Sequence, residues 1–450
     1  MPERTAALPL ARSPLPLGDG LVMRPATAAD VDELAAFNGQ MHRDHDQTEP
    51  NAFVETWTRD LMTRSHPTFS VGDFLVIEDT GSGRIVSSLN LISQTWSYGG
   101  VELGVGRPEL VGTDPSYRRR GLVRRLFEVV HRWSAERGEL AQAITGIPWF
   151  YRQFGYEMAL DLGGGRVMPR YAVPPLKEGE SEPFRFRPAT LEDLPFVVEV
   201  DRHGRGRYLV SAVRDEALWR LELDGRSDRI RPLLAVIEMP DGERLGFVTH
   251  GRVRQGNTLG VSNVELRPGA SWPALAPTLF RYLAARGAET PARSGQEPFE
   301  VIGFGLGADH PLYRVAGERI GRVNPPYAFY IRVPDLPAFV RRIGPVLERR
   351  LAGSLAPGHT GELKLSFYRS GLRLRFAEGR LAAAESFEPP DHLDAGAWFP
   401  DLTFLHLLFG HRSLDELRAA YPDCYTRGDD VPVLLETLFP KQTSRVWAIQ

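Results

Sequence analysis

Apolar residues recur at helical spacing between residues 122 and 133, directly after a short extended run. This period is carried by Leu122, Val123, Leu126, Phe127, Val130 and Trp133. Apolar residues three and four positions apart are typical of an amphipathic helix. The extended run covers residues 110–113, and Asp114-Pro115-Ser116 separates it from the helical pattern. The pattern therefore predicts a strand, a turn and a helix in that order.

The turn before the predicted helix is basic and contains a glycine. Arg118, Arg119 and Arg120 stand directly before Gly121. The first N–H groups of a helix have no acceptor within the helix, and together with the helix dipole they favour a phosphate. Three arginines beside them suit a pyrophosphate. The other interpretation is a solvated basic face with an ordinary turn glycine, and this segment alone leaves both open.

Three blocks of sequence occur twice in the same order. Residues 24–27, Arg-Pro-Ala-Thr, recur at 187–190, and in both places an acidic residue and an amphipathic run follow. Residues 74–78 resemble 233–238, and residues 150–155 resemble 312–317. Because the three blocks share nearly one offset, we interpret them as a duplicated unit.

The second copy lacks the basic turn. Its strand at 261–266 leads into residues 267–273, which have no arginine cluster before the predicted helix 275–285. Pro268, Pro273 and Pro277 also remove N–H donors that a phosphate would need. We therefore assign cofactor binding to the first copy only, and we interpret Tyr313 in the second copy as structural.

Composition limits the possible classes of protein. A chain of 450 residues is long enough for two to four domains, and 42% hydrophobic with 25% charged residues is ordinary for a globular protein. The net charge of -3 gives no sign of nucleic-acid binding. Cys424 is the single cysteine, and no apolar run approaches the ~18 residues of a membrane span. We expect a cytoplasmic protein with no membrane partner.

The arginine-glycine turn and the FYRQFGYE block at 150–157 together resemble the GNAT acetyltransferases. The family pattern is R-x-x-G-x-[GA], and Val123 departs from it where Gly or Ala is usual. The sequence LTFLHLLFGHRSLDELRAAYP and the ending LLETLFPKQTSRVW resemble the third domain of Eis-like acetyltransferases. The resemblance implies an α/β (α+β) chain with two tandem GNAT folds, the second degenerate, and a sterol-carrier-like α+β domain.

The resemblance and the repeat together give expected domain boundaries. We expect a flexible extension over 1–20, a catalytic GNAT domain over 21–172 and a linker over 173–183. A degenerate GNAT-like domain would follow over 184–333, and the sterol-carrier-like domain over 334–450. The resemblance also implies a homo-oligomer, with a hexamer as the candidate state.

The resemblance implies acetyl-CoA as co-substrate, with no metal. The residues that it places at acetyl-CoA are Val111, Gly112, Thr113, Arg118, Arg119, Arg120, Gly121, Leu122, Val123, Arg124, Gly146 and Ile147. Because a strand repeats every two residues, the backbone groups of Val111 and Thr113 point the same way and suit the pantetheine arm.

Acetyl transfer also needs an acid and a base. Tyr151 is the candidate proton donor, because a phenol with a pKa near ~10 is protonated at neutral pH and can protonate a thiolate whose acid has a pKa near ~8.5. The alternative is a core aromatic, the role expected for Tyr156. The resemblance offers two bases, the carboxylate of Glu109 and the terminal carboxylate of Gln450, and we leave the choice open.

The acceptor is an amine that the sequence does not identify. Residues 41–46, with Glu49 and Glu55, could attract a cationic amine or form a solvated loop. A metal site from His42, Asp44 and His45 lacks the spacing of a third ligand. We expect an N-acetyltransferase acting on a primary amine of a small cationic molecule or a lysine side chain. The alternatives are a lipid-binding protein and a non-catalytic CoA-binding regulator.

Overall fold

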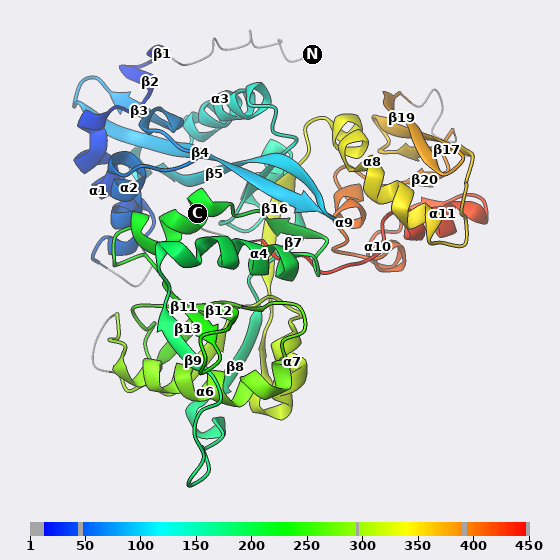
Figure 1. The fold of residues 1–450 in the computed structure, drawn as a ribbon. Helices are drawn as coiled ribbons and strands as arrows, with labels where there is room; N and C mark the ends of the chain where they lie inside the picture. The colour runs from blue at the N-terminus through cyan, green and yellow to red at the C-terminus, as the bar shows by residue number, and fades with distance from the viewer. Residues whose placement is uncertain (1–12, 44–47, 294–296, 389–393, 447–450) are drawn as a thin grey trace. The chain divides into compact units, whose positions relative to one another are not determined.

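The computed structural model describes residues 13–43, 48–293, 297–388 and 394–446. These residues form a mixed α/β structure with three β-sheets (Figure 1). The chain divides into two compact units. The first comprises Met1–Trp96, Leu103–Glu157 and Tyr330–Arg342, and the second comprises Ser97–Glu102, Met158–Phe329 and Ile343–Gln450.

The first sheet runs in the order β1-β2-β3-β4-β5-β6-β16. Its strands are β1 (Leu15–Gly18), β2 (Leu21–Pro25), β3 (Phe74–Asp79), β4 (Arg84–Tyr98), β5 (Val101–Thr113), β6 (Ala141–Ile144) and β16 (Tyr327–Arg332). Strands β1 to β4 pair antiparallel in sequence order, whereas β5 and β6 pair in parallel. The centre of the sheet is apolar, with Val76 and Leu89 fully buried.

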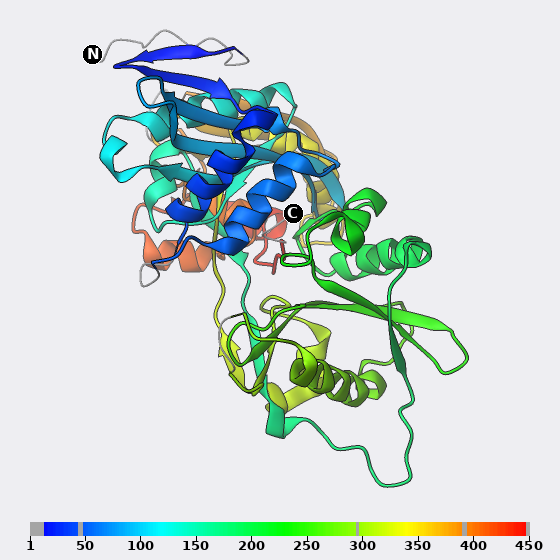
Figure 2. The same cartoon turned by 90° about the vertical axis from the view of Figure 1, so that its left-hand side faces the viewer.

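Helices cover both faces of this sheet. Helices α1 (Val31–Met41) and α2 (Ala52–Thr63) lie side by side on one face, and α3 (Leu122–Glu136) lies on the other (Figures 1 and 2). Leu126, Phe127 and Val130 of α3 are buried. The helix predicted after the basic turn is therefore confirmed, with its apolar stripe directed at the core.

The second sheet runs in the order β15-β8-β14-β13-β12-β11-β9. Its strands are β8 (Gly165–Pro169), β9 (Arg185–Pro188), β11 (Leu233–Glu238), β12 (Arg244–His250), β13 (Thr258–Leu266), β14 (Val301–Phe304) and β15 (Arg322–Asn324). The strands β7 (Glu157–Leu162) and β10 (Val210–Ala212) also lie in this stretch of the chain but are not part of this sheet. The helices of this stretch are α4 (Leu194–Arg205), α5 (Glu216–Arg220), α6 (Trp272–Glu289) and α7 (Pro311–Ala316). One large cluster of this unit packs α6 against the sheet through Leu279 and Phe304.

The repeated sequence blocks build the same cluster of hydrogen bonds twice. Arg24 donates from both terminal nitrogens to Asp30 at 2.8 Å and from Nε to Glu78 at 2.9 Å. Arg187 makes the matching bonds to Asp193, at 2.7 and 2.9 Å, and to Glu238 at 2.9 Å. In each copy the aspartate also completes a capping box with the preceding threonine. This agreement at the level of single atoms supports a duplicated unit.

The two copies exchange strands. β16 belongs to the later part of the chain, yet Tyr330 and Arg332 pair with Ile144 and Gln142 of β6 in the first sheet. β8 follows the first copy, yet it pairs with β14 and β15 in the second sheet. The sheets therefore do not follow the linear order of the repeat.

The third sheet, β19-β18-β17-β20-β21, lies in the C-terminal part of the chain. Its strands are β17 (Gly361–Ser366), β18 (Gly371–Ala377), β19 (Arg380–Phe387), β20 (Ala397–Trp398) and β21 (Tyr425–Thr426). The helices in this part of the chain are α8 (Leu336–Ala352), α9 (Phe404–Leu408), α10 (Leu414–Ala420) and α11 (Asp430–Leu438). Phe399 continues the pairing of β20, because its N–H donates to the carbonyl of Ser366. In the described parts of the chain, no helix combines the length and apolarity needed to cross a membrane.

Candidate active site

Strand β5 is interrupted at Leu110, which has a φ of 53°. A side chain in this left-handed region costs roughly 1–2 kcal/mol. The parallel pairing of β5 with β6 joins Val105 to Ala141 and Gly106 to Gln142, whereas β5 continues to Thr113. In the described residues the two strands therefore diverge, and the second half of β5 has an edge without a neighbouring strand on that side.

The backbone after Leu110 points alternately to the two sides of β5. Asp114 donates its N–H to Val86 of β4, and the hydroxyl of Ser87 donates to the carbonyl of Gly112. Even-numbered positions thus face β4. Since the direction alternates along a strand, the backbone groups of Val111 and Thr113 face the open edge.

Gly112 lets helix α1 approach this strand closely. A Cβ at position 112 would lie 3.1 Å from the side chain of Met41. The end of α1, where the candidate acceptor segment begins, is therefore packed against β5.

The turn between β5 and α3 leaves the start of the helix bare. Gly121 is the N-cap residue with a φ of 75°, and no side chain caps the first turn. A Cβ at Gly121 would meet no atom within 4 Å. The N–H groups of the first turn are therefore directed into open space, with the exposed Arg118, Arg119 and Arg120 beside them.

Two arginines of this region are held by aromatic rings. The guanidinium of Arg120 lies 4.9 Å from the ring of Tyr117, and that of Arg124 lies 5.2 Å from the ring of Phe154. Arg124 also donates to Gln153 at 3.0 Å. These contacts keep two positive charges near the start of α3.

Not every predicted cofactor residue can contribute a side chain. Leu122 is 5% exposed, so its side chain belongs to the core, and Val123 is half-buried. At Leu122, the backbone can face a ligand at the start of α3, but the side chain cannot.

The corresponding helix of the second unit has an occupied N-terminus. Ser271 caps α6, and its hydroxyl accepts a hydrogen bond from the N–H of Ala274 at 3.3 Å. Proline stands within the first two positions of α6. This helix start therefore offers fewer free donors to an anion than the start of α3.

Tyr151 and Gly146 lie together. Tyr151 is 4% exposed in the 3₁₀ turn Phe150–Phe154, and a Cβ at Gly146 would lie 3.3 Å from its hydroxyl oxygen. Gly146 has a φ of 130°, which favours glycine. The ring of Tyr330 lies 5.3 Å from that of Tyr151. The adjacent Ile147 is exposed, and its carbonyl accepts from the hydroxyl of Tyr330 at 3.1 Å.

Tyr156 has a different environment. It is fully buried, and its hydroxyl lies 2.8 Å from Nε2 of His131. Burial lowers the pKa of His131 to about 3 and raises the pKa of Tyr156 above its ordinary value. A neutral imidazole and a protonated phenol therefore share this hydrogen bond near neutral pH.

Glu109 is buried next to the interruption of β5. Its carboxylate accepts a hydrogen bond from Arg107, whose side chain is 1% exposed. Burial raises the pKa of Glu109 although Arg107 acts in the opposite direction, and burial lowers the pKa of Arg107. Sequence reasoning missed Arg107. The spacing of two residues was the available signal, since it places both side chains on one face of a strand.

The candidate acceptor region is described in part. His42 ends α1, with Nδ1 3.0 Å from the carbonyl of Asn38, and burial lowers its pKa. Glu55 of α2 packs against Gly39 of α1. Asp44, His45 and Asp46 lie outside the described residues, as does Gln450. Among the residues with a described position, no group of three or more His, Cys, Asp and Glu could hold a metal ion.

Comparison with known proteins agrees with this geometry. Residues 22–159 match the acetyltransferase (GNAT) domain family. No curated protein matches the chain in sequence.

Solved structures show a similar fold along nearly the whole chain. A GCN5-related N-acetyltransferase from Kribbella flavida is 18% identical with a TM-score of 0.66, over 95% of this chain and 97% of that one. One from Anabaena variabilis is 14% identical with a TM-score of 0.65, over 95% and 99%. Eis1 from Mycobacterium abscessus is 15% identical with a TM-score of 0.59, over 96% and 99%.

The family match covers the interrupted strand, the arginine-glycine turn, helix α3 and the Tyr151 block. These are the features on which the expected acyl-CoA site depends. The similarity of residues 22–159 to the acetyltransferase (GNAT) domain family therefore falls on the part of the chain that holds these features.

Proposed function

We propose that the protein transfers the acetyl group of acetyl-CoA to a primary amine, on a small cationic molecule or a lysine side chain. The observation that carries this proposal is the open edge of β5 after Leu110, followed directly by the bare, arginine-flanked start of α3. An extended arm and a pyrophosphate need these two features in this order. The GNAT match over residues 22–159 supports the same reaction class.

Acetyl-CoA supplies an activated thioester, and the chain supplies its orientation. The backbone groups of Val111 and Thr113 can pair with the pantetheine arm along the open edge. The first-turn N–H groups of α3 and the arginines from Arg118 to Arg124 can hold the pyrophosphate. Because the left-handed Leu110 turns the chain out of the regular ladder, the N–H of Val111 is a candidate donor to the thioester oxygen.

Tyr151 is the proposed acid. The amine nitrogen bonds to the acetyl carbon while the carbon–sulfur bond breaks, and the departing thiolate takes the phenolic proton. A phenol with a pKa near ~10 keeps that proton at neutral pH until a strong enough base forms beside it. The hydroxyl of Tyr151 lies against Gly146, one of the proposed cofactor residues, which supports this role.

The base is proposed to be one of two carboxylates. Glu109 has a pKa raised by burial, which makes its ionised form a better proton acceptor, but it is hydrogen-bonded to Arg107. The terminal carboxylate of Gln450 has an ordinary pKa near ~3.5, so it needs partial desolvation to act as a base. Either group would take the proton that the amine loses.

The remaining features of the proposal follow from the resemblance to Eis-like acetyltransferases. We propose a cytoplasmic homo-oligomer, with a degenerate GNAT-like domain and a sterol-carrier-like C-terminal domain after the catalytic one. The carboxylates of Glu49 and Glu55 near the end of α1 are proposed to attract the cationic acceptor.

A thiol-release screen tests the function. Acetyl-CoA is supplied with aminoglycosides, polyamines, amino acids and lysine peptides, and free thiol and acetylated product are measured. We expect turnover with at least one amine class. Binding of acetyl-CoA without thiol release in any reaction would favour the CoA-binding regulator. Lipid found by mass spectrometry of an extract of the purified protein, without CoA binding, would favour the lipid-binding alternative.

A further inference from the structure

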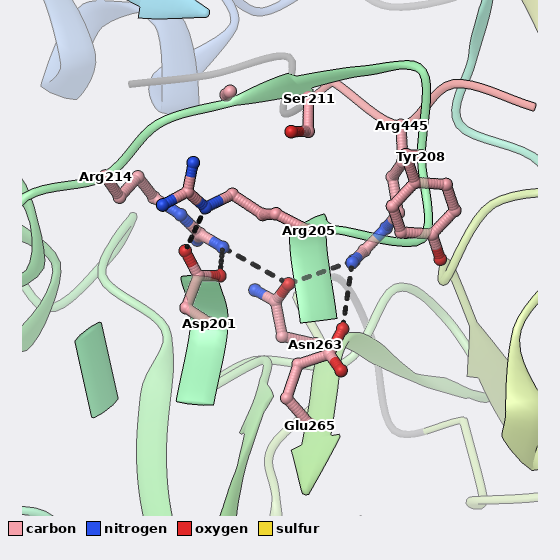
Figure 3. Close-up of a pocket in the computed structure, with 9 residues that line it drawn as sticks. Asp201, Arg205, Tyr208, Ser211, Arg214, Asn263, Glu265 and Arg445 are labelled. Atoms are coloured by element: carbon pink, nitrogen blue, oxygen red, sulfur yellow. Dashed lines mark hydrogen bonds and ion pairs between the residues drawn. The ribbon is translucent and has the colours of Figure 1, made fainter. Parts of the chain in front are cut away.

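A hollow in the second unit is lined mainly by charged side chains (Figure 3). Asp201 and Arg205 come from α4, and Ser211 comes from β10. Asn263 and Glu265 come from β13. Arg214 and Arg445 complete the charged lining.

The hollow lies where β13 has lost its parallel neighbour. β13 pairs with β14 from Thr258 to Val261, whereas Asn263 and Glu265 lie beyond the last pair. The same divergence opens the edge of β5 in the first unit. The second copy has therefore kept an opening at the corresponding place and lined it with different side chains.

The carboxylates around this hollow are already paired with arginines. Asp201 accepts from Arg214 at 2.9 Å through one oxygen, and its other oxygen lies 3.1 Å from Nε of Arg205. Both oxygens of Glu265 accept from Nη2 of Arg207 at 2.7 Å. The carboxylates are thus neutralised by arginines from the same unit.

The amide of Asn263 is used in the same way. Its oxygen accepts from Nη2 of Arg445 at 3.0 Å, and its nitrogen donates to Thr249 at 3.1 Å. A cationic ligand would therefore meet carboxylates that arginines already pair and an amide oxygen that Arg445 already contacts.

The charge of the cluster is positive. Arg205, Arg207, Arg214 and Arg445 face Asp201 and Glu265, so four guanidinium groups meet two carboxylates. The side chains of Arg205, Arg214 and Arg445 are 15%, 7% and 14% exposed. An excess of charge this far from water is costly unless an opposite charge compensates it.

The other titratable groups of the cluster add no negative charge. His310 lies 3.8 Å from Glu265, and burial lowers its pKa, so its ring is neutral near pH 7. Burial raises the pKa of Tyr208, which keeps its hydroxyl protonated. Burial acts to raise the pKa of Glu265, but His310 and Arg207 outweigh it and keep this carboxylate ionised.

Arg205 and Ser211 offer hydrogen-bond donors to a ligand in the hollow. The described contact of Arg205 with Asp201 uses Nε, so it does not occupy the terminal nitrogens. Figure 3 shows one end of this guanidinium turned away from Asp201, on the side of Ser211. Ser211 is 3% exposed and belongs to the lining. A group that only accepts hydrogen bonds would complement this side.

We propose that this hollow binds a small oxyanion, through a carboxylate or phosphate group, with Arg205 and Ser211 as donors and the arginine cluster supplying the compensating charge. A guanidinium with two free terminal nitrogens suits the two oxygens of such a group. This site belongs to the second unit and does not depend on acetyl transfer in the first.

Calorimetric titration of the full chain tests the proposal. Succinate, phosphate and, as a control for salt, chloride are titrated at constant ionic strength. We expect succinate or phosphate to occupy this hollow once per chain, with affinity for the hollow reduced at least tenfold by Arg205→Gln. Ser211→Ala, which removes one hydroxyl, should weaken the same binding by a smaller factor. Arg202→Gln is the matched control, since Arg202 is an exposed arginine of the same helix outside the lining.

The two anions separate the sources of the ligand. Binding of succinate assigns the site to a carboxylate, and binding of phosphate alone assigns it to a phosphate. The start of α3 also suits phosphate, so the phosphate titration is repeated with Gly121→Val. Phosphate binding in the hollow, which Arg205→Gln should weaken, should persist in Gly121→Val. Equal affinities of Arg205→Gln, Ser211→Ala and Arg202→Gln would overturn the proposal, as would the absence of binding of both anions to the unaltered chain.

Discussion

The hydroxyl of Tyr156 lies 2.8 Å from Nε2 of His131, which gives this phenol a buried partner on helix α3. The hydroxyl of Tyr151 instead lies against Gly146, in the loop that follows β6. The two tyrosines are close in sequence and both are buried, but their hydroxyl groups have different neighbours. Their phenylalanine variants therefore form a matched pair.

Tyr151→Phe should lower kcat by roughly 10²-fold or more with little change in acetyl-CoA affinity, because the ring stays and only the proton is lost. Tyr156→Phe should affect kcat much less, although loss of the buried hydrogen bond to His131 should lower the thermal stability. Steady-state kinetics and a thermal melt of both variants check this. Equal effects on kcat would remove Tyr151 from the role of acid.

Gly121→Val should weaken acetyl-CoA binding, because the new side chain would occupy the space in front of the first-turn N–H groups of α3. Gly269→Val is a close control. Gly269 has a φ of 84°, against 75° for Gly121, and a Cβ at either position would meet no atom within 4 Å. Backbone strain should therefore be similar in both variants. Calorimetry should show one acetyl-CoA per chain and a loss of affinity for Gly121→Val alone; equal losses would contradict a single cofactor site.

Removing Gln450, or adding residues after it, should lower kcat sharply if the terminal carboxylate is the base, whereas Gln450→Ala should have little effect. Glu109→Gln should then keep most of the rate. A C-terminally extended protein with full kcat, together with an inactive Glu109→Gln variant, would move the base to β5.

The pH profile gives an independent test of Glu109. Burial raises the pKa of this carboxyl, and only its ionised form can accept a proton. If Glu109 is the base, kcat should fall as the pH is lowered through that raised pKa, at a higher pH than for an ordinary carboxylate near ~4.3. Glu109→Gln should abolish this acidic limb. A limb that persists in the variant would assign it to another group.

Asp30→Asn should destabilise the first unit by about 1.5–3 kcal/mol at pH 7, the range for hydrogen bonds to charged groups. The bond from Arg24 lowers the pKa of Asp30 against the effect of burial. A lowered folded-state pKa means that the stabilisation is complete above the ordinary carboxyl pKa, near ~3.9, and is lost as the pH falls through the lower value. Calorimetric melts should therefore show the difference between Asp30→Asn and the unaltered chain at pH 7 shrinking below about pH 4.

Asp32→Asn is the control for this prediction, because the side chain of Asp32 is 88% exposed and pairs with Arg59 at the surface. Exposed pairs contribute about 0–1 kcal/mol. If Asp32→Asn lowered the free energy of unfolding as much as Asp30→Asn, the buried hydrogen bonds of the Arg24 cluster would stabilise the fold no more than an exposed ion pair does.

The elements of the fold that leave a local periodicity or a repeated block in the sequence could be predicted. The period from Leu122 to Trp133 gave α3, because a helix buries one face and leaves the pattern in the sequence. The apolar run over 399–409 favours one helix, but in the structure α9 covers only Phe404–Leu408, and Phe399 extends the third sheet through its bond to Ser366. Phe399 is apolar in either conformation, so the period alone could not separate a buried strand end from a helix start.

The parts of the candidate sites that one continuous segment forms could be predicted from the sequence. The parts that form where distant segments meet could not. The arginine-glycine turn is continuous, so its spacing shows in the sequence. The left-handed conformation of Leu110 has no such signal, because leucine rarely adopts it and tertiary packing must impose it. Arg445 reaches Asn263 from a part of the chain 182 residues away, and no local pattern links them.

The exchange of strands delays completion of the first sheet during synthesis on the ribosome. Gln142 of β6 bonds to Arg332 of β16, 190 residues later in the chain. Until those residues emerge, β6 presents an unpaired strand edge, the kind of surface through which nascent chains associate with one another. A fragment that ends after the first copy keeps this edge permanently. We therefore expect such a fragment to aggregate on expression, and co-expression of a segment that carries Tyr327–Arg332 to improve its recovery in the soluble fraction.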